Sequence, residues 1–120
     1  MKKIIYAICT LGFIFITSCV QKTTDQTITF ELNVIGIPHI KTVEIRIDNE
    51  AIDWEKEMEM KPIIKDSLYS LTLTGKTGYL FTEVKFKING EYELKELPNR
   101  KVFFDKSGTT LFKSTFNKIN

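Results

Sequence analysis

The stretch Glu83-Val84-Lys85-Phe86-Lys87-Ile88-Asn89-Gly90 alternates charged and apolar side chains and then ends in an Asn-Gly pair. In an extended chain successive side chains point to opposite faces, so the apolar residues share one face and the lysines share the other. The Asn-Gly pair is typical of a tight turn between antiparallel strands, because both residues tolerate positive φ. The stretch therefore predicts a β-strand with one buried face, followed by a hairpin turn.

The same alternation recurs in three other parts of the chain, and four further stretches show a weaker form of it. The clear runs are Ile28–Val34, Val43–Ile47 and Tyr69–Leu73. The weaker ones are Glu57–Lys61, Glu91–Leu94, Arg100–Asp105 and Thr109–Phe116. About seven or eight short strands separated by turns predict an all-β fold, an immunoglobulin-like antiparallel β-sandwich that occupies residues 27–120 as a single domain.

The segment from Asp48 to Met60 is rich in Glu and Lys and is the remaining candidate for a helix. Its apolar residues do not gather on one helical face, and Pro62 follows closely. We therefore expect a loop that contains Trp54, the only tryptophan, and leads into a short strand. Because Trp54 lies among charged neighbours, two roles are open: an exposed binding ring, or a half-buried ring that closes one end of the sandwich.

The first 19 residues have the three-part layout of a secretory signal. Met1-Lys2-Lys3 is followed by an apolar run from Ile4 to Ile16, which at about 20 Å is too short to cross a bilayer core of about 30 Å. The run ends in Ile16-Thr17-Ser18-Cys19, which resembles the lipobox of bacterial lipoproteins. That resemblance implies a cleaved signal peptide over 1–18 and a lipid-modified Cys19. The alternatives are an uncleaved membrane anchor, or an ordinary secretory signal in which Cys19 has no special role.

Residues 19–26 are polar and lack apolar periodicity, so we expect the lipidated cysteine to be joined to the fold by a short tether. Several acyl chains would hold the protein on a membrane without a transmembrane helix. Val20 differs from the aspartate that follows the cysteine in many inner-membrane lipoproteins, which favours the outer membrane. We expect the protein in the cell envelope, on the periplasmic or the surface leaflet.

Charge and cysteine content exclude several classes of function. The chain has 17 basic and 15 acidic side chains, and loss of Lys2 and Lys3 with the signal peptide would balance them, so we expect no nucleic-acid partner. Cys9 lies within the signal peptide and Cys19 would carry lipid, so the domain has neither a disulfide nor a cysteine metal site. His39 is the only histidine, and no pattern of a catalytic triad or metal site surrounds it. We expect no enzyme activity, no metal and no cofactor.

The order of motifs from Val43 onward resembles that of the family 20 starch- and glycogen-binding modules and their relatives, over roughly Thr27 to Phe116. The stretches that carry the likeness are Ala51-Ile52-Asp53-Trp54, Glu57-Met58-Glu59-Met60, Ser67–Leu73, Glu83–Glu93 and Pro98-Asn99-Arg100. In that family two aromatic rings form a platform for a glucan, and polar side chains beside them hold sugar hydroxyls. The resemblance implies that Trp54 is the first ring, that Tyr92 is the second and that Asn99 is a polar contact.

Together these features predict a non-catalytic, membrane-anchored lipoprotein whose domain binds an α-glucan of the starch type or another carbohydrate. The alternative is a structural or protein-interaction lipoprotein of the envelope, with a degenerate module that binds no sugar. Such a protein would contact an envelope partner through a sheet edge or through the Trp54 loop.

Overall fold

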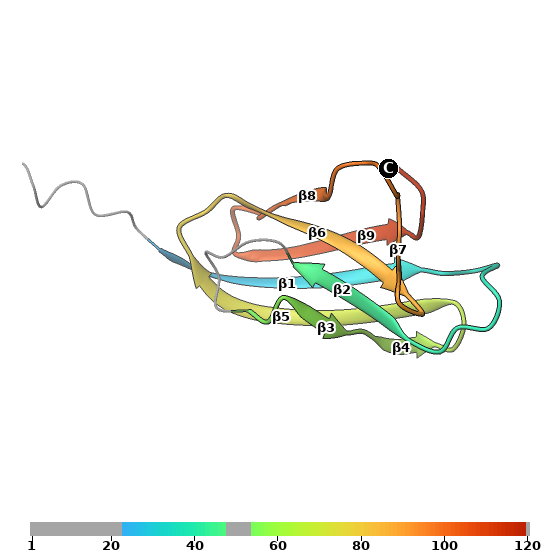
Figure 1. Cartoon of the computed structure of the whole chain (residues 1–120). Helices are drawn as coiled ribbons and strands as arrows, with labels where there is room; N and C mark the ends of the chain where they lie inside the picture. The colour runs from blue at the N-terminus through green and yellow to red at the C-terminus, as the bar shows by residue number, and fades with distance from the viewer. Residues whose placement is uncertain (1–22, 48–53, 120) are drawn as a thin grey trace, which may run out of the picture.

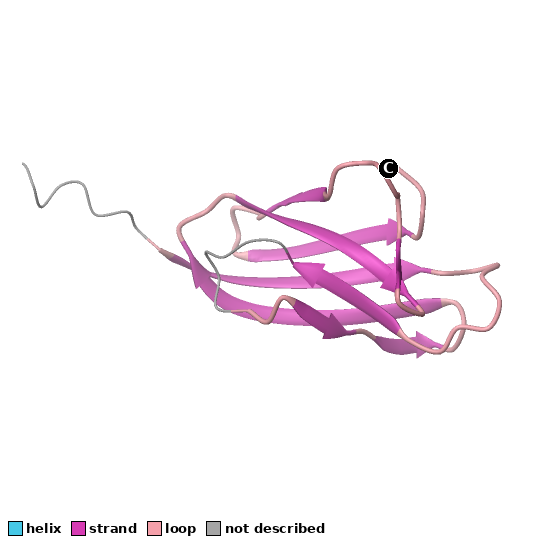
Figure 2. Ribbon diagram, viewed as in Figure 1, coloured by secondary structure: helices cyan, strands magenta, loops and turns pink. Residues whose placement is uncertain are grey.

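The computed structural model of the chain describes residues 23–47 and 54–119. Within these residues all regular secondary structure is β-strand (Figures 1 and 2). The strands are β1 (Thr24–Asn33), β2 (Val43–Ile47), β3 (Glu57–Glu59), β4 (Lys61–Ile64), β5 (Leu68–Thr77), β6 (Phe81–Ile88), β7 (Glu91–Tyr92), β8 (Arg100–Phe103) and β9 (Thr109–Thr115). In this part of the chain no helix is long and apolar enough to cross a membrane.

The strands form two sheets that pack face to face, as Figure 1 shows. The first sheet has the order β4-β5-β1-β9, and the second has the order β3-β2-β6-β7. Strand β8 also joins the second sheet by pairing with the first half of β6, whereas β7 pairs with its last two residues. This arrangement confirms the predicted all-β, immunoglobulin-like sandwich.

The alternating runs supply the core between the sheets, as their pattern predicted. In β6, and in β1 from Gln26 onward, the side chains alternate between buried and half-buried positions. The most deeply buried apolar side chains come from both sheets and from the strand ends: Ile28, Phe30, Leu32, Val34, Val43, Ile45, Val84, Phe86 and Val102. Phe86, in the middle of the alternating Glu83–Gly90 stretch, is fully buried. A period of two thus determines which face of each strand packs inward.

Three details differ from the sequence expectation. Strand β9 pairs with β1 in parallel, whereas the other strand pairs are antiparallel. Strand β1 begins at Thr24, because Thr24–Gln26 continue the ladder opposite Gly75–Thr77, so three residues of the expected tether lie in the first sheet. Lys61–Ile64 forms a separate edge strand whose four residues are all exposed, so it shows none of the alternation that marks a half-buried strand.

The predicted turn between β6 and β7 is present at Asn89-Gly90, where φ is 52° and 83°. Two successive residues with positive φ are what a two-residue hairpin turn of this kind requires. The Asn89 side chain also contacts the β1–β2 connection. Its Oδ1 accepts hydrogen bonds from the backbone N–H of Lys41 and Thr42, at 2.7 and 3.1 Å, and its Nδ2 donates to the carbonyl of His39 at 2.8 Å. One turn residue therefore joins the hairpin to a loop far away in the sequence.

Candidate functional site

Tyr92 lies in β7, next to the outer face of the second sheet. Its hydroxyl donates a 2.7 Å hydrogen bond to Glu57 Oε1 of β3, and Arg46 of β2 donates a longer bond of 3.3 Å to the same hydroxyl. Lys87 Nζ is 5.1 Å from the centre of the Tyr92 ring, within the range of a cation–π contact, and 3.3 Å from Glu57 Oε1. Side chains from three other strands thus fix the orientation of the ring.

These contacts also bias the ionisation of the charged partners. The hydrogen bond from Tyr92 and then that from Lys87 lower the pKa of Glu57 below its usual value of 4.5. The hydrogen bond to Glu57 raises the pKa of Lys87 above 10.5. A lowered acid pKa and a raised amine pKa both favour the charged forms near neutral pH. Glu57 and Lys87 are therefore held in their charged forms, as a carboxylate and an ammonium.

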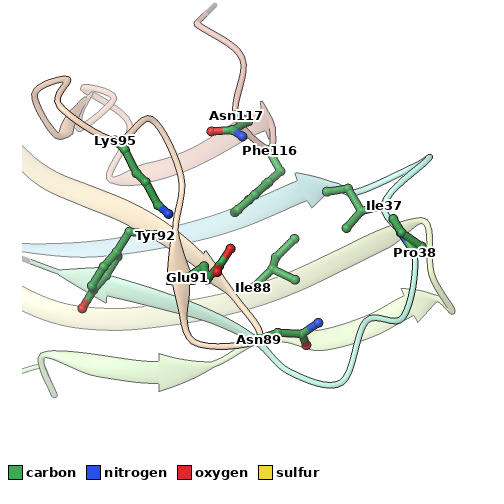
Figure 3. A pocket seen from close by; sticks show the side chains of 9 residues that line it. All are labelled: Ile37, Pro38, Ile88, Asn89, Glu91, Tyr92, Lys95, Phe116 and Asn117. Atoms are coloured by element: carbon green, nitrogen blue, oxygen red, sulfur yellow. The ribbon is translucent and has the colours of Figure 1, made fainter.

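Tyr92 also lines a pocket of about 410 Å³ at one end of the sandwich (Figure 3). The pocket is lined by residues of the β1–β2 connection, the β6–β7 hairpin, the segment after it and the two residues after β9: Ile37, Pro38, Ile88, Asn89, Glu91, Tyr92, Lys95, Phe116 and Asn117. Ile37, Pro38 and Phe116 supply an apolar wall, while Glu91 and Lys95 are exposed charged groups that also line the pocket. A pocket with an apolar wall and charged groups suits a small amphipathic ligand.

Two amides that line this pocket already serve the fold. The Asn89 amide is held by its three hydrogen bonds to the β1–β2 connection. Asn117 Oδ1 accepts a 2.7 Å hydrogen bond from the backbone N–H of Leu94. The polar groups that remain best placed to contact a ligand are Glu91 and Lys95, which Figure 3 shows on either side of the Tyr92 strand.

Trp54 lies in the loop before β3, as the sequence predicted, and its ring is half-buried against the core. Its indole N–H donates a 2.9 Å hydrogen bond to the carbonyl of Thr74 in β5. Strand β4 pairs with β5 only up to Ser70, so the Thr74 carbonyl lies on a part of the β5 edge that β4 does not reach. Trp54 therefore connects the loop before β3, in the second sheet, to the edge of the first sheet. This contact supports the role of a half-buried ring that packs against the sandwich.

Asn99 lines a different pocket, of about 230 Å³, together with Leu94, Leu97, Pro98, Arg100 and Ile119. The structure therefore does not bring the three residues of the expected sugar site into one pocket: Tyr92 and Asn99 line separate ones, and Trp54 lines neither of these two. Cys19 lies outside the described residues.

The residue beside Asn99 takes part in a contact that sequence reasoning missed. Arg100 forms a bidentate ion pair with Glu93, with Nε and Nη2 each 2.8 Å from a carboxylate oxygen. Glu93 is completely buried, which is unusual for a carboxylate. The only sequence signal was a Glu and an Arg near the ends of two short predicted strands, which is too common to single out a pair. The Glu93–Arg100 pair joins the segment just after β7 to the start of β8.

Among the described residues, no group of three or more His, Cys, Asp or Glu side chains is arranged to hold a metal ion. Comparison of the chain with protein-family models and with curated proteins finds no significant match.

Proposed function

We propose that this chain is a non-catalytic, lipid-anchored protein of the cell envelope whose β-sandwich binds a carbohydrate at the Tyr92 pocket. The observation that supports it best is the composition of that pocket, which Tyr92 lines together with the apolar Ile37, Pro38 and Phe116 and the charged Glu91 and Lys95. A sugar ring has an apolar C–H face and a hydroxyl rim, so an aromatic ring and charged hydrogen-bonding groups complement its two parts.

Anchoring is proposed from the Ile16-Thr17-Ser18-Cys19 motif, which resembles a lipobox. The pocket lies among the end of β6, the residues just after β9 and the segment after β1. Thr24, where β1 begins, is at the other end of a ten-residue strand of about 30 Å. A lipid on Cys19 would therefore attach the domain at the end opposite the Tyr92 pocket, so that a soluble glycan could reach the pocket.

The sugar-binding proposal is tested by calorimetric titration of the chain from Gln21 onward with a panel of α- and β-glucans. We expect weak binding, with Kd near 0.1 to 1 mM, or about −4 to −5.5 kcal/mol. Tyr92→Ala should weaken binding at least about fivefold, since one stacking ring supplies about 1 kcal/mol. Tyr92→Phe should retain most of the affinity, because it keeps the ring and loses only the hydroxyl.

Tyr79→Ala is the matched control, because Tyr79 is another half-exposed tyrosine but lies between β5 and β6, outside the Tyr92 pocket. Trp54→Ala separates the two roles of the tryptophan: a loss of about 3 kcal/mol or more of unfolding free energy with unchanged affinity identifies a packing residue. Loss of affinity at constant stability identifies a binding ring instead. If no glucan in the panel binds, the carbohydrate proposal fails.

The second candidate is a structural or protein-interaction lipoprotein. It is favoured by the contacts of Tyr92 itself, whose hydroxyl and ring are already engaged by Glu57, Arg46 and Lys87. A chain that binds no glucan but in which Tyr92→Ala lowers stability would support this role.

A further inference from the structure

An exposed apolar patch lies at the end of the sandwich where β5 turns into β6 and where β8 ends. It consists of Tyr79, Leu80 and Phe103, whose exposed fractions are 53%, 78% and 65%. Phe81 and Phe103 are opposite each other in the β6–β8 pair, and their ring centres are 5.6 Å apart. The backbone N–H of Phe104 donates a 2.9 Å hydrogen bond to the carbonyl of Leu80, so β8 and the β5–β6 turn are joined directly. We call Tyr79, Leu80 and Phe103 the apical patch.

The first residues of β1 lie at this same end. Thr24 pairs with Thr77 at the end of β5, just before Tyr79. Thr24, Tyr79 and Leu80 line one pocket of about 450 Å³. Figure 1 also shows the chain entering β1 beside the turn between β5 and β6. The apical patch and the point where the chain enters the fold are therefore neighbours.

Chain length then limits how far this end lies from the proposed lipid anchor. Five residue steps separate Cys19 from Thr24, and a fully extended chain covers at most about 18 Å over that distance. This reach is shorter than the sandwich itself, because β1 alone is about 30 Å long. If Cys19 carries lipid, the β1 entry end of the domain must stay close to the bilayer surface, whatever path the tether takes.

We propose that the apical patch rests on the lipid bilayer and orients the sandwich upright on the membrane, with the Tyr92 pocket at the far end. This inference rests on the proposed lipidation of Cys19. Leucine and phenylalanine gain from burial among acyl chains, and tyrosine favours the interface between headgroups and acyl chains.

The charges around the patch are mixed, so the apolar side chains supply the contact. Lys101 lies over the Phe81 ring at 5.2 Å, and Lys76 and Lys106 are exposed at the same end. Asp25 and Asp105 line the same pocket as Lys106 and offset these charges. Anionic headgroups would therefore strengthen the contact only modestly.

The test uses the full, acylated protein in vesicles of phosphatidylethanolamine and phosphatidylglycerol that contain a nitroxide-labelled lipid. A fluorophore is attached to a single introduced cysteine, since the processed chain would have no other free thiol. Lys106→Cys reports on the membrane-facing end, because Lys106 lines the same pocket as Leu80. Ile35→Cys is the matched control, because Ile35 is 71% exposed and follows the far end of β1.

We expect strong quenching of the label at position 106 and little at position 35. Leu80→Ser combined with Phe103→Ser should reduce the quenching at position 106 by about twofold or more, because the tether alone leaves the domain free to tilt. Equal quenching at the two positions, or quenching at position 106 that the serine variant leaves unchanged, would overturn the proposal. The mass of the purified chain separates this failure from failure of the anchor: a chain without acyl groups refutes the lipoprotein itself, whereas an acylated chain without oriented quenching refutes only the docking.

Discussion

At the scale of single residues, the least expected feature is the burial of Glu93. Its carboxylate accepts hydrogen bonds from the backbone N–H of Phe86 and of Asn117, each at 3.1 Å, and from the guanidinium of Arg100. Arg100 Nη2 is also 2.7 Å from the carbonyl oxygen of Lys118. A buried carboxylate is tolerated only when such donors replace water. One ion pair thus connects β6, β8 and the segment after β9.

Arg100→Ala should lower the free energy of unfolding by about 3 to 5 kcal/mol, because it leaves the buried Glu93 carboxylate without its charged partner. Arg100→Lys should restore only part of this loss, since an ammonium cannot form the bidentate contact. Arg46→Ala, which removes an exposed arginine from the outer face, is the control and should cost about 1 kcal/mol or less. Urea unfolding followed by circular dichroism measures all three. A small and equal loss in Arg100→Ala and Arg46→Ala would show that the pair does not stabilise the fold.

At the scale of the elements, the sequence predicted those strands that have one face in the core and the other toward solvent. Strands β1, β2, β5 and β6 all have an alternating stretch, and β6 is the clearest of them. Strand β4 was missed as a separate strand because all its residues are exposed, so alternation has no physical cause there. The parallel pairing of β9 with β1 was also missed, since a local pattern shows which face is buried but not which strand lies alongside.

The candidate site was harder to predict than the fold, for a related reason. Tyr92 was singled out from the sequence by resemblance, and it does line a pocket. Its partners Glu57, Arg46 and Lys87 come from three other strands, so only the register of the second sheet brings them together. Trp54 and Asn99 were selected by the same resemblance, but their neighbours likewise depend on packing between distant segments.

The β6–β7 turn provides a prediction at this scale. Asn89→Gly keeps a residue that accepts positive φ but removes three hydrogen bonds to the β1–β2 connection. We expect a loss of about 1 to 3 kcal/mol of unfolding free energy, because two backbone N–H groups lose their partner. Asn89→Ala should cost about 1 kcal/mol more, since alanine is strained at positive φ. If Asn89→Gly unfolds at the same urea concentration as the unaltered chain, the turn acts through its backbone conformation alone.

At the scale of the whole molecule, the two ends of the sandwich differ in chemistry. The end where β1 enters has the apical patch of Tyr79, Leu80 and Phe103. The opposite end has the Tyr92 pocket, formed after β1, β6 and β9 have crossed the length of the domain. Because β1 and β9 run parallel, both strands begin at the end with the apical patch and finish at the end with the Tyr92 pocket. A lipid anchor before β1 would place one end on the membrane and present the other to the surroundings.

Acylation of Cys19 is the claim on which this arrangement depends. It is measured most directly by growing bacteria that produce the full chain with radiolabelled palmitate and following the label on the purified protein. We predict that the unaltered chain incorporates label, that Cys9→Ala does so equally, because Cys9 lies within the expected signal peptide, and that Cys19→Ala remains an unlabelled precursor. Equal labelling of the Cys19→Ala chain and the unaltered chain, or no label on either, would contradict the account.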